Sequence, residues 1–117
     1  MNEIKRFALS ARSSGLVVAG GRLETSGIVA APGVARDIAA QTRSVLDQLE
    51  GLLRLADADK RNLTTMQIWL ADMKDFDAMN RVYDQWVGNV DQPARACVGA
   101  ALATDDYLIE IRATGVL

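Results

Sequence analysis

The strongest constraint on the fold is a long, one-sided apolar stripe in the first half of the chain. Its members recur at spacings of three and four residues: Ile38, Val45, Leu46, Leu49, Leu52 and Leu53. Charged and polar residues fill the intervening positions, as in an amphipathic helix with one buried side. We predict a helix over residues 34–55, ended by the polar segment 56–62. Such a helix needs a second apolar layer to pack against.

A strand and a second helix follow this segment. Residues 63–72 alternate between two faces, which indicates a half-buried strand. One face carries Met66, Ile68 and Leu70, and the other carries Thr65, Gln67 and Trp69. Residues 76–87 form the second amphipathic pattern, which we expect Asp72 or Asp75 to cap. Its apolar stripe consists of Phe76, Met79, Val82, Tyr83 and Trp86.

We predict strands near both ends of the chain. Residues 4–19 contain one or two strands closed by glycines, and residues 26–33 form a loop or a short strand. Near the C-terminus, two runs of small and β-branched residues flank a polar turn at 103–106, which predicts a β-hairpin. The core face of this hairpin would carry Ala96, Val98, Ala100, Tyr107, Ile109 and Ile111. The opposite face would carry Arg95, Cys97, Gly99, Glu110 and Arg112.

This order of elements predicts a single α+β domain over residues 1–117, with two helices on one face of a mixed sheet of five to six strands. Two helices cover only one face of such a sheet. A large, partly apolar second face is seldom left bare, so we expect a partner subunit to cover it.

Composition limits the functions that are open to the chain. The 13 basic and 15 acidic residues give a net charge of −2, which disfavours binding dominated by nucleic-acid phosphates. The lone Cys97 fits a reducing compartment, and no apolar run is long enough for a signal peptide or a membrane span, so we expect the cytoplasm. The chain has no histidine, which rules out the usual zinc sites and histidine-based catalysis. We expect no metal.

Two charges in the predicted hairpin require an explanation, because strand interiors are poor in charge. In the predicted register Glu110 lies four residues along from Arg95, or roughly 13 Å, too far for a direct ion pair. Either a small ligand lies between the two side chains, or each meets a neighbouring chain. Two structural explanations of these charges stay open. Arg95 could be a purely structural interface residue, and Glu110 could form an ion pair with Arg112.

The same residues carry a family resemblance. The segment "PARACV", followed by "IEI" with its glutamate fifteen residues after the arginine, resembles the C-terminal signature of the YjgF/Rid family of enamine/imine deaminases. Residues 37–59, 64–87 and 17–21 are similar to the family's first helix, its strand and second helix, and a strand ending in glycine. The resemblance covers residues 15–117.

The resemblance implies a chorismate-mutase-like α+β fold and a homotrimer around a central barrel, with ligand sites between subunits. It also implies hydrolysis of 2-aminoacrylate and other 2-imino acids to 2-keto acids and ammonia, without a cofactor. Arg95 matches the family residue that binds the substrate carboxylate, and Glu110 matches the one that positions the hydrolytic water. Cys97 matches a residue lining the pocket, and Gly20, with Gly21 beside it, matches a glycine whose backbone approaches the ligand.

The chain also departs from the family pattern. Ala19 occupies a position where many members have serine, Gly21 and Arg112 replace polar and acidic residues, and the family's tyrosine-bearing N-terminal segment is absent. These departures keep a second interpretation open, in which the trimer binds or senses small carboxylates in the same cleft without turnover. A ribonuclease activity is a third reading, opposed by the acidic balance and the absence of histidine.

Overall fold

The computed structural model describes residues 3–89 and 91–117, so positions 1, 2 and 90 of the predicted domain lie outside the described residues. The strands and helices are, in chain order, β1 (Ile4–Leu9), β2 (Ser14–Ala19), β3 (Arg22–Thr25), β4 (Ile28–Val29), α1 (Ile38–Leu55), β5 (Leu63–Leu70), α2 (Phe76–Val87), β6 (Ala94–Gly99) and β7 (Ile109–Val116). Short 3₁₀ turns, η1 (Lys60–Asn62) and η2 (Met73–Asp75), precede β5 and α2.

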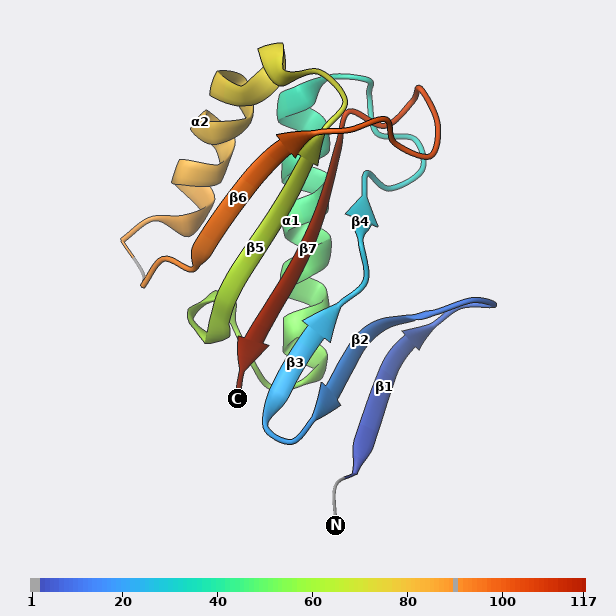
Figure 1. The fold of residues 1–117 in the computed structure, drawn as a ribbon, viewed down its shortest axis with the longest axis vertical. Coiled ribbons are helices and arrows are strands. Elements are labelled where there is room, and N and C mark those ends of the chain that lie inside the picture. Colours follow the sequence, from blue (N-terminus) through green and yellow to red (C-terminus); the bar gives the residue numbers. More distant parts are fainter. Residues whose placement is uncertain (1–2, 90) are drawn as a thin grey trace.

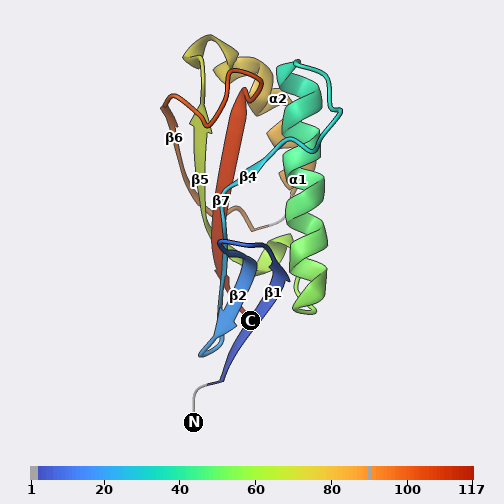
Figure 2. The ribbon, with the colours of Figure 1, turned by 90° about the vertical axis from the view of Figure 1, so that its right-hand side faces the viewer.

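The described strands form one mixed sheet in the order β1-β2-β3-β7-β5-β6, with β4 paired to β7 (Figure 1). Both helices pack on the same side of the sheet and leave the other face open (Figure 2). The predicted α+β class and the placement of both helices on one face are therefore confirmed. The predicted count of five to six strands is wrong, because the described residues form seven strands.

The helices follow the predicted stripes. The range 76–87 is confirmed for α2, whereas α1 begins at Ile38, four residues later than predicted. Asp37 sets this start because its carboxylate accepts a hydrogen bond from the Ala40 amide at 2.9 Å, which satisfies a free N–H of the first turn. Asp72 caps η2 through the Lys74 amide, while Asp75 makes no side-chain cap.

The core lies between the helices and the sheet. The prediction that Met66, Ile68 and Leu70 share the inner face of β5 is confirmed, since all three are fully buried. Their neighbours on β7, Ile109 and Ile111, are also fully buried, and the stripe of α1 packs over them. The largest buried side chains thus meet on the central strands β5 and β7.

The predicted C-terminal hairpin is wrong. β6 pairs with β5 in parallel, and β7 pairs with β5 antiparallel on its other side, so β6 and β7 are not neighbours. The segment between them crosses the end of β5, where the Ala71 amide donates to the Leu108 carbonyl and the Ala100 amide to the Leu70 carbonyl. The reason is topological: β5, α2 and β6 form a βαβ unit, whose two strands run parallel.

This pairing reverses the predicted faces of β6. Arg95 pairs with Met66 and Cys97 with Ile68, so both point to the helix side of the sheet. Ala96 and Val98 point to the open face, where Val98 is 47% exposed, and they are not core residues. On β7 the predicted faces are correct: Ile109 and Ile111 are buried, while Glu110 and Arg112 face the open side.

A buried glutamine fixes the loop that leads into β7. Gln41 on α1 is 2% exposed; its Nε2 donates to the Asp106 carbonyl and its Oε1 accepts from the Leu108 amide, both at 2.8 Å. The position at which β7 enters the sheet, and therefore the place of Glu110, depends on this pair of bonds.

We expect Gln41→Leu to lower the free energy of unfolding by about 2–5 kcal/mol, because it leaves two backbone groups without their partner. Chemical denaturation followed by circular dichroism measures this change. Gln85→Leu on the exposed side of α2 is the control and should change stability by less than about 0.5 kcal/mol. Equal effects of the two substitutions would contradict the role of Gln41.

Candidate functional site

Arg95 is held by helix α2. It lies at the start of β6, which is an edge strand, and its Nη1 donates to the Asn80 Oδ1 at 2.7 Å. Its guanidinium carbon lies 4.7 Å from the ring centroid of Tyr83 and 6.0 Å from that of Phe76. The residue remains exposed. An arginine with one N–H anchored and one flat side on an aromatic ring keeps its remaining N–H groups available for a carboxylate.

The contacts of Asn80, Tyr83 and Phe76 with Arg95 were not predicted from the sequence. Tyr83 and Phe76 belong to the apolar stripe of α2 and pack against the core. Their rings also form the surface beneath the guanidinium of Arg95. A prediction of parallel pairing between β6 and β5 would have placed Arg95 on the helix side of the sheet, beside α2.

Cys97 lies two residues further along β6 on the same face, half-buried against the core. Burial raises the pKa of its thiol above the ordinary value, and the nearby Arg95 opposes this rise. A thiol of this kind is largely protonated near neutral pH and is a poor nucleophile. The described cavities include none that is lined by Cys97, so its role as a pocket-lining residue stays a prediction.

Glu110 lies on the other side of the sheet. It occupies β7 opposite Trp69 of β5 and Val29 of β4, and its carboxylate rests against Gly27. The alternative ion pair of Glu110 with Arg112 does not form among the described residues; instead, Arg112 Nε donates to the Thr25 carbonyl at 3.3 Å.

A single chain does not bring Arg95 and Glu110 together. Glu110 and Val98 both pair with Trp69, so Glu110 lies at the level of Val98 in the sheet. Val98 is three residues further along β6 than Arg95. The two strands are separated by β5, so the backbones lie roughly 10 Å apart across the sheet and roughly 10 Å along it. The expectation that both side chains share one face is wrong, because parallel pairing of β6 turns Arg95 to the helix side.

Gly20 and Gly21 form the turn between β2 and β3. Both have positive φ angles, +58° and +75°, which favour glycine, and an added Cβ would meet nothing within 4 Å at either position. The Leu117 amide donates to the Gly21 carbonyl and ties the chain end to this turn. In the sheet, the strands β7 and β5 lie between this turn and β6, so within one chain the turn is remote from Arg95.

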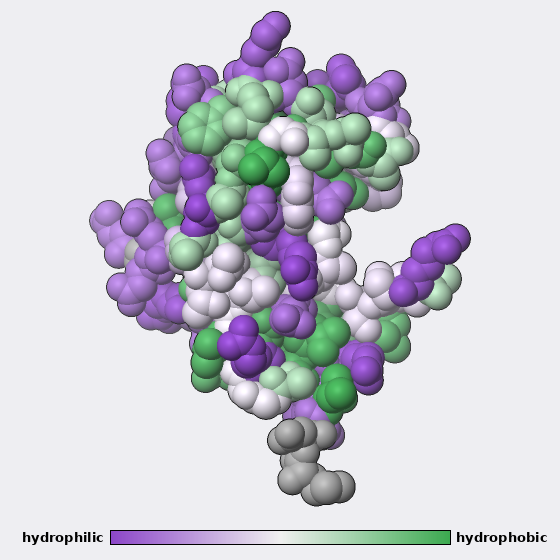
Figure 3. Space-filling model, viewed as in Figure 1, coloured by the Kyte–Doolittle hydropathy of each residue, from purple (hydrophilic) through white to green (hydrophobic). Residues whose placement is uncertain are grey.

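The open face of the sheet has mixed character (Figure 3). Exposed apolar side chains on it, Ile4, Val98 and Val116, alternate with charged residues such as Glu24 and Arg112. Among the described residues nothing packs over this face, and none of the described acidic or cysteine side chains gather into a group of three able to hold a metal ion. Neither described α-helix has the length and hydrophobicity of a membrane-spanning segment.

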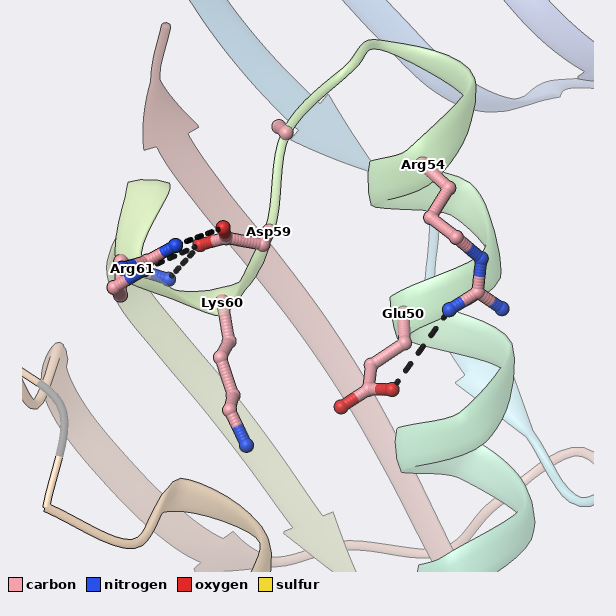
Figure 4. Close-up of a pocket in the computed structure, with 6 residues that line it drawn as sticks. Glu50, Arg54, Asp59, Lys60 and Arg61 are labelled. Atoms are coloured by element: carbon pink, nitrogen blue, oxygen red, sulfur yellow. Dashed lines mark hydrogen bonds and ion pairs between the residues drawn. The ribbon is translucent and has the colours of Figure 1, made fainter.

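A cavity of about 310 Å³ lies between the end of α1 and η1. Figure 4 shows the residues that line it. Its charges are satisfied internally: Arg61 binds Asp59 at 2.8 Å, and Arg54 lies 3.9 Å from Glu50. Hydrogen bonds from Arg61 lower the pKa of Asp59 to about 2. Lys60 turns away to donate to the Trp86 carbonyl, so this cavity presents no free charged group and we read it as structural.

A second cavity, of about 540 Å³, lies between the β1–β2 hairpin, β4 and α1. It is large enough for a small metabolite and is mostly apolar, with Gly27 in its wall. The described cavities include none that is lined by Arg95 or Glu110.

The comparisons with known proteins agree with this fold. The family model described as Endoribonuclease L-PSP matches residues 3–117. A RutC family protein from Haemophilus influenzae is 36% identical over 108 residues, covering 92% of this chain and 93% of that protein. A 3-aminoacrylate deaminase RutC from Acinetobacter baylyi is 40% identical over 75 residues, covering 64% of this chain and 59% of that protein.

Among solved structures, a member of the YjgF protein family from Neisseria meningitidis is 38% identical and superimposes with a TM-score of 0.91. The match covers 97% of this chain and 94% of that one. The chain therefore belongs to the YjgF/Rid family, which includes proteins named RutC.

We expect the alkylation rate of Cys97 by iodoacetamide to rise continuously from pH 7 to pH 9, because burial raises the pKa of the thiol above its ordinary value. Cys97→Ser supplies the blank, and a free thiol such as glutathione supplies the reference. A rate that reaches a plateau below pH 8 would mean an activated thiolate and would contradict the role of Cys97 as a passive wall.

Proposed function

We propose that the protein hydrolyses reactive 2-imino and 2-enamino acids, of the 2-aminoacrylate type, to 2-keto acids and ammonia. The observation that carries this proposal is the exposed, pre-oriented guanidinium of Arg95 on an edge strand. Membership of the YjgF/Rid family and similarity to a protein named as a 3-aminoacrylate deaminase support it.

Arg95 is proposed to bind the substrate carboxylate. Asn80 holds one N–H of the guanidinium and Tyr83 underlies its face, so the group is oriented before the substrate arrives. Two parallel, charge-assisted hydrogen bonds to a carboxylate fix both the position and the direction of a 2-imino acid. Binding then requires little further ordering of the arginine side chain.

Glu110 is proposed to position the water that reacts. No hydrogen bond or ion pair to its carboxylate is present among the described residues, so the oxygens are available to a water molecule. A proton moves to the β-carbon of the enamine and gives the imine. Water then adds to the carbon of the C=N bond, and the resulting carbinolamine loses ammonia as its C–N bond breaks. Glu110 accepts and returns the proton in these steps.

Because Arg95 and Glu110 lie on opposite faces, we propose that they meet across a boundary between two subunits of a homotrimer. The edge strand β6 and the open face of the sheet are both uncovered in one chain. Contact between the β6 edge of one subunit and the open face of the next would bring Arg95 of the first toward Glu110 of the second. The same contact would cover the apolar part of that face.

A second candidate function is binding of small carboxylates without turnover. Its support is that Asn80 and Tyr83 orient Arg95 independently of Glu110, so one half of the site suffices to hold an acid. Binding of a 2-keto acid by isothermal titration calorimetry, together with no acceleration of imine hydrolysis, would favour this function.

The test uses imino acids generated in situ by an amino-acid oxidase, with 2-keto acid release as the readout. Arg95→Ala should lower kcat/KM by roughly 10²–10⁴-fold, since two charge-assisted hydrogen bonds are lost. Glu110→Gln should lower kcat by about 10²–10⁴-fold while binding persists. Arg54→Ala and Glu50→Gln, at an exposed and a half-buried position of α1 outside the proposed site, are the matched controls and should retain wild-type rates.

Full activity of Glu110→Gln would remove the assigned role of Glu110. The absence of acceleration by the wild-type protein with any imino acid would overturn the proposed activity. Ribonuclease activity is assayed in parallel on the same preparation, and we expect none.

A further inference from the structure

Gly27 lies in the short connection between β3 and β4, where a side chain would have no room while Glu110 keeps its present conformation. Its φ angle is outside the left-handed region, so backbone conformation does not require glycine there. The lack of space favours glycine instead. An added Cβ would overlap Oε2 of Glu110 and would lie 2.9 Å from its Cδ and 3.3 Å from its Cγ. The glutamate side chain thus fills the volume that a side chain at residue 27 would occupy.

The backbone around Gly27 is anchored on both sides. Before it, the Ser26 amide donates to the Gly15 carbonyl at 3.0 Å. After it, Val29 pairs with β7, and Gln48 Nε2 donates to the Val29 carbonyl at 2.8 Å. A substitution at Gly27 therefore cannot be absorbed by a shift of the connection at small cost. The group that moves is the side chain of Glu110.

The conformation of Glu110 depends on packing alone. Among the described residues no hydrogen bond and no ion pair fixes its carboxylate, and Arg112 is directed to Thr25 instead. The side chain is half-buried, with β4 beside it and Gly27 against its carboxyl end. Steric confinement thus takes the place of the polar partners that usually orient a functional carboxylate.

From this contact we infer that Gly27 is a positioning residue: by lacking a side chain it forms a slot that fixes the carboxylate of Glu110. The inference rests on the function proposed above, in which Glu110 positions the reacting water. A misplacement of about 1 Å costs roughly 10²-fold in rate, so the slot determines whether the water stands in reach of the imine carbon.

The test compares Gly27→Ala in two backgrounds. With Glu110 present, Gly27→Ala should lower kcat by about 100-fold and leave KM within a few-fold, because the carboxylate is displaced while Arg95 is untouched. In the Glu110→Asp background, the carboxylate is one methylene shorter and reaches less deeply into the slot, so adding Gly27→Ala should reduce the remaining rate by less than about 3-fold. Gly51→Ala is the matched control, since its added Cβ would meet only Arg54 Nη2, at 3.9 Å.

Thermal unfolding supplies a readout that does not depend on activity. Gly27→Ala should lower the Tm by roughly 4 °C or more when Glu110 is present and by clearly less in the Glu110→Asp background, because the shorter side chain overlaps the new Cβ less. If the wild-type protein hydrolyses no imino acid, the proposed function fails and this coupling still decides whether the slot exists.

Two results would overturn the inference. One is equal losses of kcat and Tm from Gly27→Ala in both backgrounds, which would mean that the substitution acts on the fold in general. The other is unchanged kcat and Tm with Glu110 present, which would mean that Glu110 has room to move without consequence.

Discussion

The strand β5 and its two unlike neighbours determine the rest of the structure. β6 runs parallel to β5 because helix α2 carries the chain back along the sheet, and β7 runs antiparallel on the other side. This pairing turns Arg95 toward α2 and leaves Glu110 on the open face. In the proposed function, one chain therefore presents two half-sites, the Arg95 edge that would bind the substrate carboxylate and the Glu110 carboxylate on the open face, and each needs the other from a neighbouring subunit.

Each half-site is organised by a different kind of interaction. Arg95 is oriented by polar and aromatic groups of α2, through its bond to Asn80 and its stacking on Tyr83. Glu110 has no such partner among the described residues and is confined by Gly27 and β4. The buried Gln41 contributes at a distance, because it holds the loop from which β7 enters the sheet. A site shared between two subunits needs both halves to be rigid before they meet.

The sequence was sufficient for the elements whose side chains repeat on one face. The stripe of α2 and the alternation of β5 depend on burial alone, and both were predicted at the correct residues. Pairing direction depends on topology, so the short turn before β7 was mistaken for a hairpin although the helix between β5 and β6 favours parallel strands. β3 was not predicted because its four residues include two charges and gain their order from β2 and β7. The contact of Gly27 with Glu110 exists only in the folded chain.

The measurement that tests the central claim most directly is complementation between two inactive variants. Arg95→Ala and Glu110→Gln subunits are mixed in equal amounts under denaturing conditions, refolded together and assayed for imino-acid hydrolysis. If each site takes Arg95 from one subunit and Glu110 from its neighbour, random assembly restores about one quarter of wild-type activity. If both residues of a site come from the same chain, no assembled site contains both, and the mixture stays as inactive as its components. That second result would contradict the account.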